Sequence, residues 1–295
     1  MSDNPKPQRY ASWTAGKLPL PELREMKRRG EKIVMVTAYD APSGRLADAA
    51  GVDMILVGDS SGMVVHGRES TVAVSLDEIL LMTQWVMRGA KRPLVVADMP
   101  FGSYEVSNEQ AVTNAVRLVK DGGADAVKLE RGGTTVARAR AIVDAGVPVM
   151  GHVGLTPQTA TVLGGFKAQG RTADQATLLL EEAAALEAAG CFAVVLEAVP
   201  AAVARTVTQA LTVPTIGIGA GGDCDGQVLV WHDMLGYYDG HAPRFVKRYA
   251  DLGEVITEAL GRFAEDVRSG AFPEDQHTYA MPAEELAAFE AAKKR

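Results

Sequence analysis

The chain has 295 residues, of which 47% are hydrophobic and 23% charged, so it can bury a large core and is typical of a globular protein. Its formal net charge is −7 and it has no long block of Lys or Arg, which argues against nucleic acid as a partner because phosphate neutralisation requires clustered cations. No apolar stretch approaches the roughly 18 residues of a membrane span, so we expect no membrane partner.

The N-terminal residues 1–20 resemble an arm. The first 17 are polar and contain no apolar core of a secretory signal. The two cysteines, Cys191 and Cys224, are far apart and outside any metal-ligand spacing. A disulfide between them is left open, but two thiols in a chain of this size are typical of a reducing compartment. From the absence of an apolar signal core and from these two thiols, we expect a cytoplasmic protein.

Residues 21–277 alternate between short apolar runs and segments with helical periodicity. Eight runs are expected to be strands, at 33–40, 53–60, 93–100, 126–130, 148–154, 191–199, 214–220 and 228–235. The helices expected between them are clearest at 109–121 and 174–189. Near-continuous apolar strands separated by helices indicate a parallel sheet that is covered on both faces. The eightfold alternation favours an α/β fold of the closed (β/α)₈ TIM barrel type over an open doubly wound sheet.

The C-terminal tail, residues 278–295, is charged and rich in Ala, and we expect a helix from residue 282 onward. Neither terminal segment carries recognisable chemistry, and arms of this kind are expected to pack on a neighbouring subunit or to remain mobile.

Acids stand at the ends of five of the expected strands, at Asp40, Asp59, Asp98, Glu130 and Glu197. One Asp at such a place most often caps the next helix. Five acids at one mouth of a barrel would repel one another, however, and a divalent cation bound by oxygen would neutralise them. Mg²⁺ typically uses one or two carboxylates together with waters and substrate oxygens. Asp59 and Asp98 are the expected metal ligands, directly or through water.

Ser60 follows Asp59 between flanking glycines and offers a hydroxyl and an amide to a ligand. Lys128 and Glu130 are two apart on one strand and therefore share a face. In the barrel, Lys128 could bind a substrate carboxylate while Glu130 faces the metal. The two could instead form a structural ion pair, or Lys128 could be the Schiff-base nucleophile of a class I aldolase.

Glu197 lies within an apolar run, which suits an acid that transfers a proton, although a salt bridge with a neighbouring strand is the alternative. His152 ends the fifth strand and is either a substrate-orienting residue or a hydrogen-bonded core residue. His232 and Asp233, on the expected eighth strand, and His241 are weaker candidates.

The segment Gly217-x-Gly219-x-x-Gly222 formally matches a dinucleotide-binding fingerprint. It follows an expected strand, but residues 223–235 turn briefly and lead to another strand, whereas the fingerprint opens a helix. The glycines are better explained by a tight turn or by room for a ligand.

Several phrases together resemble the ketopantoate hydroxymethyltransferase family. They are TAYD (37–40), LVGDSSGMVVHG (56–67), ADMPFGSY (97–104), VKLERGG (127–133), GHVGLTPQ (151–158), GGFKAQGR (164–171), LEAAGCFAVVLEAVP (186–200), PTIGIGAG (214–221) and DGQVLVWHDMLG (225–236). They follow the family's order over residues 20–277. The sequence departs from the family in longer tails and in His277-Thr278-Tyr279, where related chains often have His-Ser-Phe.

This resemblance implies a barrel of the phosphoenolpyruvate/pyruvate-binding superfamily type, Mg²⁺ as the metal and assembly into a homodecamer. It implies transfer of a hydroxymethyl group from 5,10-methylenetetrahydrofolate to 3-methyl-2-oxobutanoate, giving 2-dehydropantoate for pantothenate and coenzyme A biosynthesis. The family's metal and substrate positions fall on Asp59, Ser60, Asp98, Lys128 and Glu130. Its proposed base falls on Glu197.

The residues suit this chemistry, because a 2-oxo acid can chelate Mg²⁺ through its carboxylate and keto oxygens, and the cation then stabilises the enolate formed when the C3 proton leaves. Our hypothesis is that Glu197 takes that proton while Lys128 holds the substrate carboxylate or the developing charge. The alternatives are another Mg²⁺-dependent 2-oxo-acid lyase or mutase on the same barrel, a Schiff-base aldolase, and a non-catalytic binding protein on a decayed barrel. Lyases of this type normally carry a reactive Cys on a mobile loop, and neither cysteine here has such a context.

Overall fold

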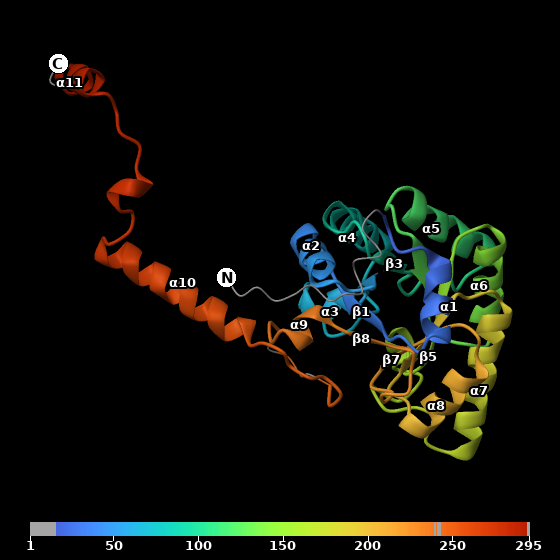
Figure 1. The fold of residues 1–295 in the computed structure, drawn as a ribbon. Coiled ribbons are helices and arrows are strands. Elements are labelled where there is room, and N and C mark those ends of the chain that lie inside the picture. Colours follow the sequence, from blue (N-terminus) through green and yellow to red (C-terminus); the bar gives the residue numbers. More distant parts are fainter. Residues whose placement is uncertain (1–15, 239, 241–242, 294–295) are drawn as a thin grey trace.

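The computed structural model describes residues 16–238, 240 and 243–293, and within them eight parallel strands form a closed barrel (Figure 1). Each strand pairs with the next along the chain, and β8 pairs with β1 to close the ring. The predicted (β/α)₈ barrel is confirmed. The strands are β1 Ile33–Thr37, β2 Met54–Val57, β3 Leu94–Asp98, β4 Ala126–Lys128, β5 Val149–Gly154, β6 Ala193–Glu197, β7 Thr215–Ile218 and β8 Gly226–Leu229.

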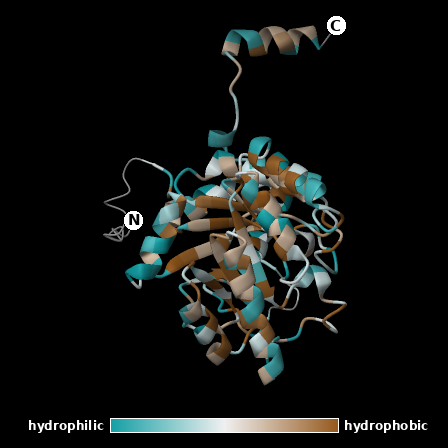
Figure 2. Cartoon of the chain, turned by 90° about the vertical axis from the view of Figure 1, so that its right-hand side faces the viewer, coloured by the Kyte–Doolittle hydropathy of each residue, from teal (hydrophilic) through white to brown (hydrophobic). Residues whose placement is uncertain are grey.

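The strands are apolar on both faces because both faces are covered. β2 and β3 are buried at every position. Successive side chains alternate between the two sides of a strand. On β2, Met54 belongs to the cluster that fills the barrel interior, while Ile55 belongs to the cluster between barrel and helices. Figure 2 shows the hydrophobic strands at the centre of the molecule, surrounded by helices whose outer faces are more hydrophilic.

Helices connect successive strands and form the outer layer. Those between β1 and β7 are α2 Ala41–Ala50, α3 Ser61–Val64, α4 Leu76–Gly89, α5 Asn108–Lys120, α6 Thr135–Asp144, α7 Ala173–Ala188 and α8 Ala201–Ala210. The predicted helices at 109–121 and 174–189 are confirmed as α5 and α7. At the start of α4, Ser75 accepts a hydrogen bond from the Glu78 amide and the Glu78 carboxylate accepts one from the Ser75 amide, which is a capping box.

Helix α1, Leu20–Arg28, closes the end of the barrel at which the strands begin. Leu23 and Met26 join the interior cluster. Lys27 Nζ is 2.9 Å from Asp225 Oδ2 and also donates to the Thr208 and Val213 carbonyls, which ties the helix to the barrel. This end is therefore filled, and the opposite end, where the strands finish, is left for a site.

The predicted eighth strand, residues 228–235, is wrong in its bounds. β8 is Gly226–Leu229, and the apolar residues beyond it form the short helix α9, Trp231–Met234. A Cβ at position 226 would lie 2.5 Å from the Ile33 carbonyl oxygen, so the strand begins at a glycine that an apolar pattern does not reveal. Trp231 and Met234 are three apart and both pack against the helix-side core, which explains why the run continues as a helix.

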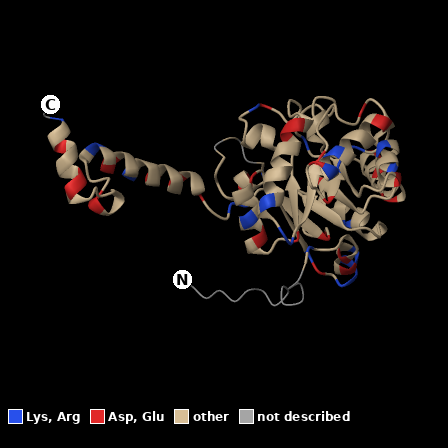
Figure 3. Cartoon of the chain, turned by 90° about the horizontal axis from the view of Figure 1, so that it is seen from above, with Lys and Arg blue, Asp and Glu red and all other residues tan. Residues whose placement is uncertain are grey.

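The C-terminal part of the chain leaves the barrel as α10, Leu252–Ser269, followed by the 3₁₀ turn η3, Asp275–His277, and α11, Ala283–Ala292 (Figures 1 and 3). None of these three elements has a buried residue. The helix predicted from residue 282 is confirmed as α11.

Some predictions concern residues outside the described ones. These are the arm up to residue 15, His241 and the last two residues. The division of the chain into an arm, a barrel ending at residue 277 and a tail stays a prediction. In the described part of the chain, no helix is both long and apolar enough to cross a bilayer.

Candidate active site

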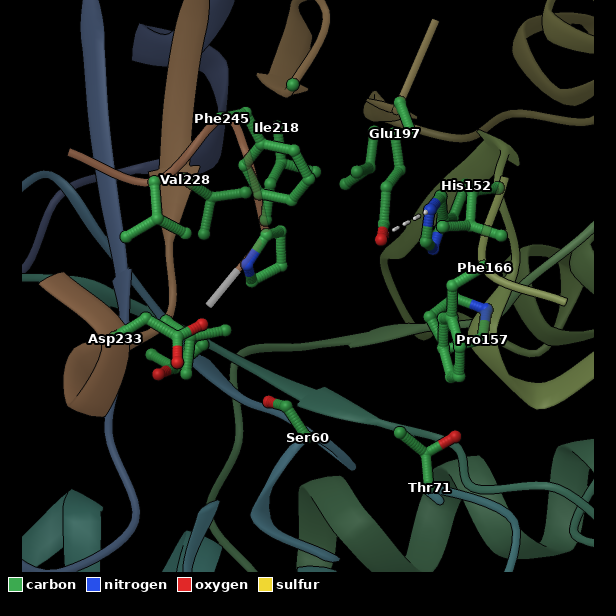
Figure 4. A pocket seen from close by; sticks show the side chains of 18 of the residues that line it. Ser60, Thr71, His152, Pro157, Phe166, Glu197, Ile218, Val228, Asp233 and Phe245 are labelled. Carbon is green, nitrogen blue, oxygen red and sulfur yellow. Dashed lines mark ion pairs between the residues drawn. The ribbon is translucent and has the colours of Figure 1, made fainter. Parts of the chain in front are cut away.

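A cavity of about 910 Å³ lies at the carboxyl ends of the strands (Figure 4). In β/α barrels this is the end that carries the active site. The polar residues predicted from the sequence meet here from five different strands or the turns that follow them, and all seven line the cavity: Asp59, Ser60, Asp98, Lys128, Glu130, His152 and Glu197.

The turn after β2 brings Asp59 against Asp98 at the end of β3. The Asp59 amide donates a hydrogen bond of 3.0 Å to Asp98 Oδ2. A Cβ at Gly58 would lie 2.9 Å from Ser60 Oγ and 3.4 Å from Asp98 Oδ2, so glycine allows the turn to fold this tightly. Ser60 Oγ is also 2.9 Å from the hydroxyl of Tyr39. This contact orients the Ser60 hydroxyl at the edge of the cavity.

Lys128 is buried among carboxylates. Its Nζ lies 2.7 Å from Asp98 Oδ1 and 3.6 Å from Glu130 Oε1. Burial alone would lower the pKa of Lys128, but the charges of Asp98, Glu130 and Asp59 outweigh it and raise the pKa well above its ordinary value. Lys128 is thus held as an ammonium ion, whereas a Schiff-base lysine must lose its proton to become a nucleophile. The ion pair that we weighed between Lys128 and Glu130 therefore exists, with Asp98 as the nearer partner.

His152, on β5, lies between two of the acids. Its Nδ1 is 3.5 Å from Glu130 Oε1, and its Nε2 is 3.3 Å from Glu197 Oε2, the contact dashed in Figure 4. Burial and the nearby Lys128 lower the pKa of His152, but the carboxylates of Glu130 and Glu197 outweigh them and raise this pKa to about 9. At neutral pH the imidazolium of His152 therefore holds Glu197 in place. The salt bridge with a neighbouring strand that the sequence left open for Glu197 is thus found, with His152 of β5 as the partner.

Two strained backbone positions directly follow acids of the site. Arg131, after Glu130, has φ 79°, and Ala198, after Glu197, has φ 49°. L-residues rarely adopt this left-handed region, and each instance costs about 1–3 kcal/mol. Hydrogen bonds from the Arg131 amide to the His152 carbonyl (2.9 Å) and from the Ala198 amide to the Ile218 carbonyl (2.8 Å) hold the strained turns. These turns set the direction in which the two acids leave their strands.

The charges at the floor of the cavity do not balance. Four carboxylates (Asp59, Asp98, Glu130 and Glu197) face two cations (Lys128 and His152), which leaves two negative charges. The pKa of Asp59 is raised well above its ordinary value by burial and by repulsion from Asp98 and Glu130. Burial likewise raises the pKa of Asp98, although Lys128 opposes this. Burial is the first cause of both shifts, and repulsion between the acids adds to it, so a further cation at this place would favour the charged carboxylates.

This donor set fits a divalent cation. Among the described residues, no three acid, His or Cys side chains stand close enough to form a complete metal site by themselves. Mg²⁺ does not require one, because it commonly takes one or two protein carboxylates and completes its shell with waters and substrate oxygens. The predicted ligands Asp59, Asp98 and Glu130 are suited to such a role.

Gln158 organises this acid cluster and was not among the residues predicted from the sequence. It lies in the buried 3₁₀ turn η2, Pro157–Thr159, after β5. Its side-chain amide donates to Asp59 Oδ2 (2.9 Å), its backbone amide donates to Glu130 Oε2 (3.1 Å), and its Oε1 accepts from the Tyr104 hydroxyl (2.5 Å). The only signal was its place at the end of the GHVGLTPQ phrase.

Asp40 does not join the site, which corrects the prediction of five acids at the mouth. Asp40 is exposed and caps helix α2. Its carboxylate accepts hydrogen bonds from the Ser43 amide (2.7 Å) and from the Ser43 hydroxyl (2.5 Å). For this acid the helix-cap reading was the right one. A different acid, Asp233 of α9, lines the cavity in its place.

The other motifs do not contribute charged groups. Cys191 and Cys224 are free, buried and located before β6 and β8, at the opposite end of the barrel from the cavity. Burial raises the pKa of Cys191 to about 12 and also raises that of Cys224, so neither is a reactive thiolate. After Gly219 the chain continues into β8 and not into a helix, as predicted, and Phe245 packs where a Cβ at Gly219 would lie.

Comparisons with known proteins agree with this architecture. The sequence profile of the family described as ketopantoate hydroxymethyltransferase matches residues 17–275. A relative from Moorella thermoacetica, called 3-methyl-2-oxobutanoate hydroxymethyltransferase, is 59% identical over 260 residues, which cover 88% of this chain and 97% of the relative.

Solved structures at much lower identity share the fold. A 2,3-dimethylmalate lyase, described as a member of the PEP mutase/isocitrate lyase superfamily, superposes with a TM-score of 0.55 at 16% identity, covering 92% of this chain and 98% of the lyase. A phosphonopyruvate hydrolase in complex with oxalate and Mg²⁺ superposes with a TM-score of 0.57 at 14% identity, covering 93% and 95%. These likenesses show that the chain shares its fold with these proteins.

Proposed function

The chain belongs to the ketopantoate hydroxymethyltransferase family, and on that premise we propose the reaction that it catalyses. It transfers a hydroxymethyl group from 5,10-methylenetetrahydrofolate to 3-methyl-2-oxobutanoate, giving 2-dehydropantoate for pantothenate and coenzyme A synthesis. The observation that carries the proposal is the unbalanced charge of the acid cluster, in which four carboxylates (Asp59, Asp98, Glu130 and Glu197) face only Lys128 and His152. This arrangement suits a metal-assisted reaction of a small 2-oxo acid.

Asp59, Asp98 and Glu130 would hold Mg²⁺, and Ser60, Lys128 and His152 would surround the 2-oxo acid. When bound, the cation would polarise the keto group and stabilise negative charge on its oxygen. Lys128 is a fixed ammonium with Asp98 on one side, and it can attract the substrate carboxylate without giving up its proton. Ser60, oriented by Tyr39, offers a hydroxyl to a substrate oxygen.

Glu197 removes the proton from C3 of the 2-oxo acid, and the electron pair of the broken C–H bond is left on the substrate. That carbon then forms a bond to the methylene carbon of the folate, and both bonds from this methylene carbon to nitrogen (N5 and N10) break to leave tetrahydrofolate. The two protons of a water molecule and the proton taken by Glu197 end on the two nitrogens and on the new hydroxyl. One water is consumed overall, and its oxygen becomes the hydroxyl of the product. Glu197 suits the role of base because it lies at the edge of the cavity, with 14% of its side chain exposed, and is held from behind by His152 at 3.3 Å.

We propose that the protein acts as a homo-oligomer, with the decamer of the family as the expected form. The support is a stripe of apolar residues along one side of α10, spaced three or four residues apart: Ile256, Leu260, Phe263 and Val267. These side chains are 39–62% exposed in the isolated chain. An apolar stripe of this kind is typical of a surface that packs against another protein. The two unpaired thiols support a cytoplasmic location.

The reaction is tested by incubating purified protein with 3-methyl-2-oxobutanoate, 5,10-methylenetetrahydrofolate and Mg²⁺, and detecting 2-dehydropantoate by mass spectrometry. A parallel incubation contains EDTA, and a third omits the folate. Product that requires both folate and metal supports the proposal. If a competent folate donor yields no product, the alternative of another Mg²⁺-dependent 2-oxo-acid lyase or mutase on the same barrel is favoured.

A further inference from the structure

The cavity is much larger than one substrate requires. A five-carbon 2-oxo acid occupies only a small part of about 910 Å³, a volume that suits a drug-sized ligand. The acid cluster forms one side of the cavity floor. The remaining walls are mainly apolar and include Phe166 and Pro157 on one side and Phe245, Ile218 and Val228 on the other (Figure 4). This part of the cavity is suited to a flat, largely apolar ring system.

One acid stands apart from the cluster within these apolar walls. Asp233 lies in α9, directly beyond β8, and its side chain faces the cavity across from Glu197 and His152 (Figure 4). The residue is only 9% exposed. Burial raises the pKa of Asp233, although the charge of Arg248 opposes this.

Asp233 has no partner among the described residues that would explain its burial. No hydrogen bond or ion pair to its carboxylate occurs within 16–238, 240 and 243–293, and Arg248 pairs with Asp251 at 3.5 Å. The carboxylate lines the cavity without a partner in the described part of the chain, so its oxygens are available to accept hydrogen bonds from a bound ligand. A carboxylate can accept two parallel hydrogen bonds from neighbouring N–H donors.

We propose that Asp233 recognises the pterin ring of the folate co-substrate, accepting hydrogen bonds from its N3–H and its 2-amino group. This inference rests on the proposed function and adds the residue that binds the second substrate. The 2-oxo acid has no N–H donor, so of the two substrates only the pterin can satisfy Asp233 in this way. The chemistry that Asp233 selects is a ring edge with two adjacent N–H donors.

The position of Asp233 also fits the reaction. In the folate, the N3 and 2-amino edge lies at one end of the fused ring, and the methylene carbon that is transferred lies at the other end. Asp233 and Glu197 lie on opposite walls of the cavity. A pterin held by Asp233 therefore directs its methylene carbon toward the acid cluster, where the 2-oxo acid is activated. Exposed Lys167, Arg171 and Arg244 also line the cavity and can face the carboxylates of the glutamate tail.

The test compares binding of tetrahydrofolate to the wild type and to Asp233→Asn by isothermal titration calorimetry. The variant keeps the shape of the side chain but replaces one acceptor with a donor. We expect its Kd for tetrahydrofolate to rise about 10–100-fold, the range for one or two charged hydrogen bonds. Its Kd for 3-methyl-2-oxobutanoate should change less than about threefold. Asp223→Asn is the matched control, because Asp223 is exposed, pairs with Arg205 and precedes β8 at the other end of the barrel.

A second arm changes the ligand and needs no altered protein. The analogue 2-desamino-2-methyltetrahydrofolate lacks the 2-amino donor, and the wild type should bind it about 10-fold more weakly than tetrahydrofolate. Asp233→Asn should lose much less, because its side chain is uncharged and can no longer accept both hydrogen bonds of the pterin edge. Equal losses in both proteins, or tetrahydrofolate binding by Asp233→Asn within about twofold of the wild type, would overturn the proposal.

Exchange of the C3 proton of 3-methyl-2-oxobutanoate in D₂O separates the two proposals, because it uses no folate. If the wild type and Asp233→Asn both exchange the proton and only Asp233→Asn binds tetrahydrofolate weakly, the proposed function and the role of Asp233 are both supported. If the wild type exchanges the proton but Asp233→Asn binds tetrahydrofolate normally, the proposed role of Asp233 fails while the proposed reaction is retained. If the wild type neither exchanges the proton nor binds tetrahydrofolate, the proposed function and this inference both fail.

Discussion

Lys128 Nζ lies 2.7 Å from Asp98 Oδ1, and the two residues face each other in register on the neighbouring strands β4 and β3. Both are almost completely buried. The pair places a permanent positive charge beside the acids Asp59 and Glu130, which is what allows so many carboxylates to share one cavity. We therefore expect Lys128 to act through its positive charge and not as a nucleophile.

We therefore predict that Lys128 forms no Schiff base. Treating the protein with borohydride in the presence of 3-methyl-2-oxobutanoate should leave the mass of the Lys128 peptide unchanged, because an ammonium ion held by Asp98 is not a nucleophile. Mass spectrometry of the digested protein is the measurement, with a class I aldolase as the positive control. A reduced adduct on Lys128 would favour aldolase chemistry over metal chemistry.

The second prediction concerns Gln158. Replacing it with Leu removes the side-chain hydrogen bond to Asp59 while the backbone amide can still reach Glu130. Residues that orient metal ligands typically contribute about 10–100-fold to metal affinity or activity, so we expect a loss of that size. Titration with Mn²⁺, followed by electron paramagnetic resonance, measures it. Gln84→Leu, at a half-buried glutamine on α4 away from the cavity, should bind the metal like the wild type. Normal metal affinity in Gln158→Leu would show that Asp59 does not need this hydrogen bond.

The third prediction concerns stability and pH. The pKa of Glu78 is lowered to about 2, mainly by hydrogen bonds from Arg68. The hydrogen bond from the Ser75 amide in the capping box contributes as well. A carboxyl whose pKa is lower in the folded than in the unfolded chain stabilises the fold above its unfolded pKa of about 4.5, and the effect is lost as the pH falls toward 2.

Glu78→Gln should thus lower the free energy of unfolding by about 1 kcal/mol at pH 7, a modest figure because water screens this partly exposed group. The deficit should shrink between pH 5 and pH 3, as urea denaturation at a series of pH values can measure. Glu25→Gln, which removes a more exposed pair with Arg28, serves as the control and should cost little at any pH. A deficit that stays constant with pH would contradict the assignment.

The fourth prediction concerns assembly. Leu260→Asp places a charge in the apolar stripe of α10 and should shift the protein toward smaller species, because burying an unpaired carboxylate between subunits is unfavourable. Light scattering coupled to size-exclusion chromatography gives the mass. Glu265→Ala, on the same helix outside the stripe, should leave the mass unchanged. If Leu260→Asp has the mass of the wild type, the stripe is not a subunit contact.

The barrel was predictable from the sequence because its signal is repeated eight times. Each apolar run is short, but eight such runs that alternate with helices are compatible with few folds other than a closed barrel. The bounds of β8 were not predictable, because residues 228–235 are apolar throughout and an apolar run does not distinguish a strand from a buried helical turn. Only the pairing of Gly226 with Ile33 shows where this strand begins.

The candidate site was predictable where position on a strand decides the direction of a side chain. Lys128 and Glu130 share a face by the period of two, and acids at strand ends meet at one mouth. Asp40 failed this rule because its side chain turns back to cap α2. Gln158 was missed because it lies in a turn, and what it contacts depends on the path of the chain after β5. The position of Asp233 at the cavity was not predicted, because the residue was placed within a strand and in fact lies in α9, beyond the end of β8.

The measurement that tests the central claim most directly is C3 proton exchange in Glu197→Gln. The claim is that the acid cluster binds the 2-oxo acid and that Glu197 takes its C3 proton. Nuclear magnetic resonance in D₂O follows the exchange of 3-methyl-2-oxobutanoate with Mg²⁺ present, and calorimetry follows its binding. We predict that Glu197→Gln binds the 2-oxo acid within a few-fold of the wild type but exchanges the proton about 10²–10⁴ times more slowly. Exchange at the wild-type rate would show that Glu197 is not the base.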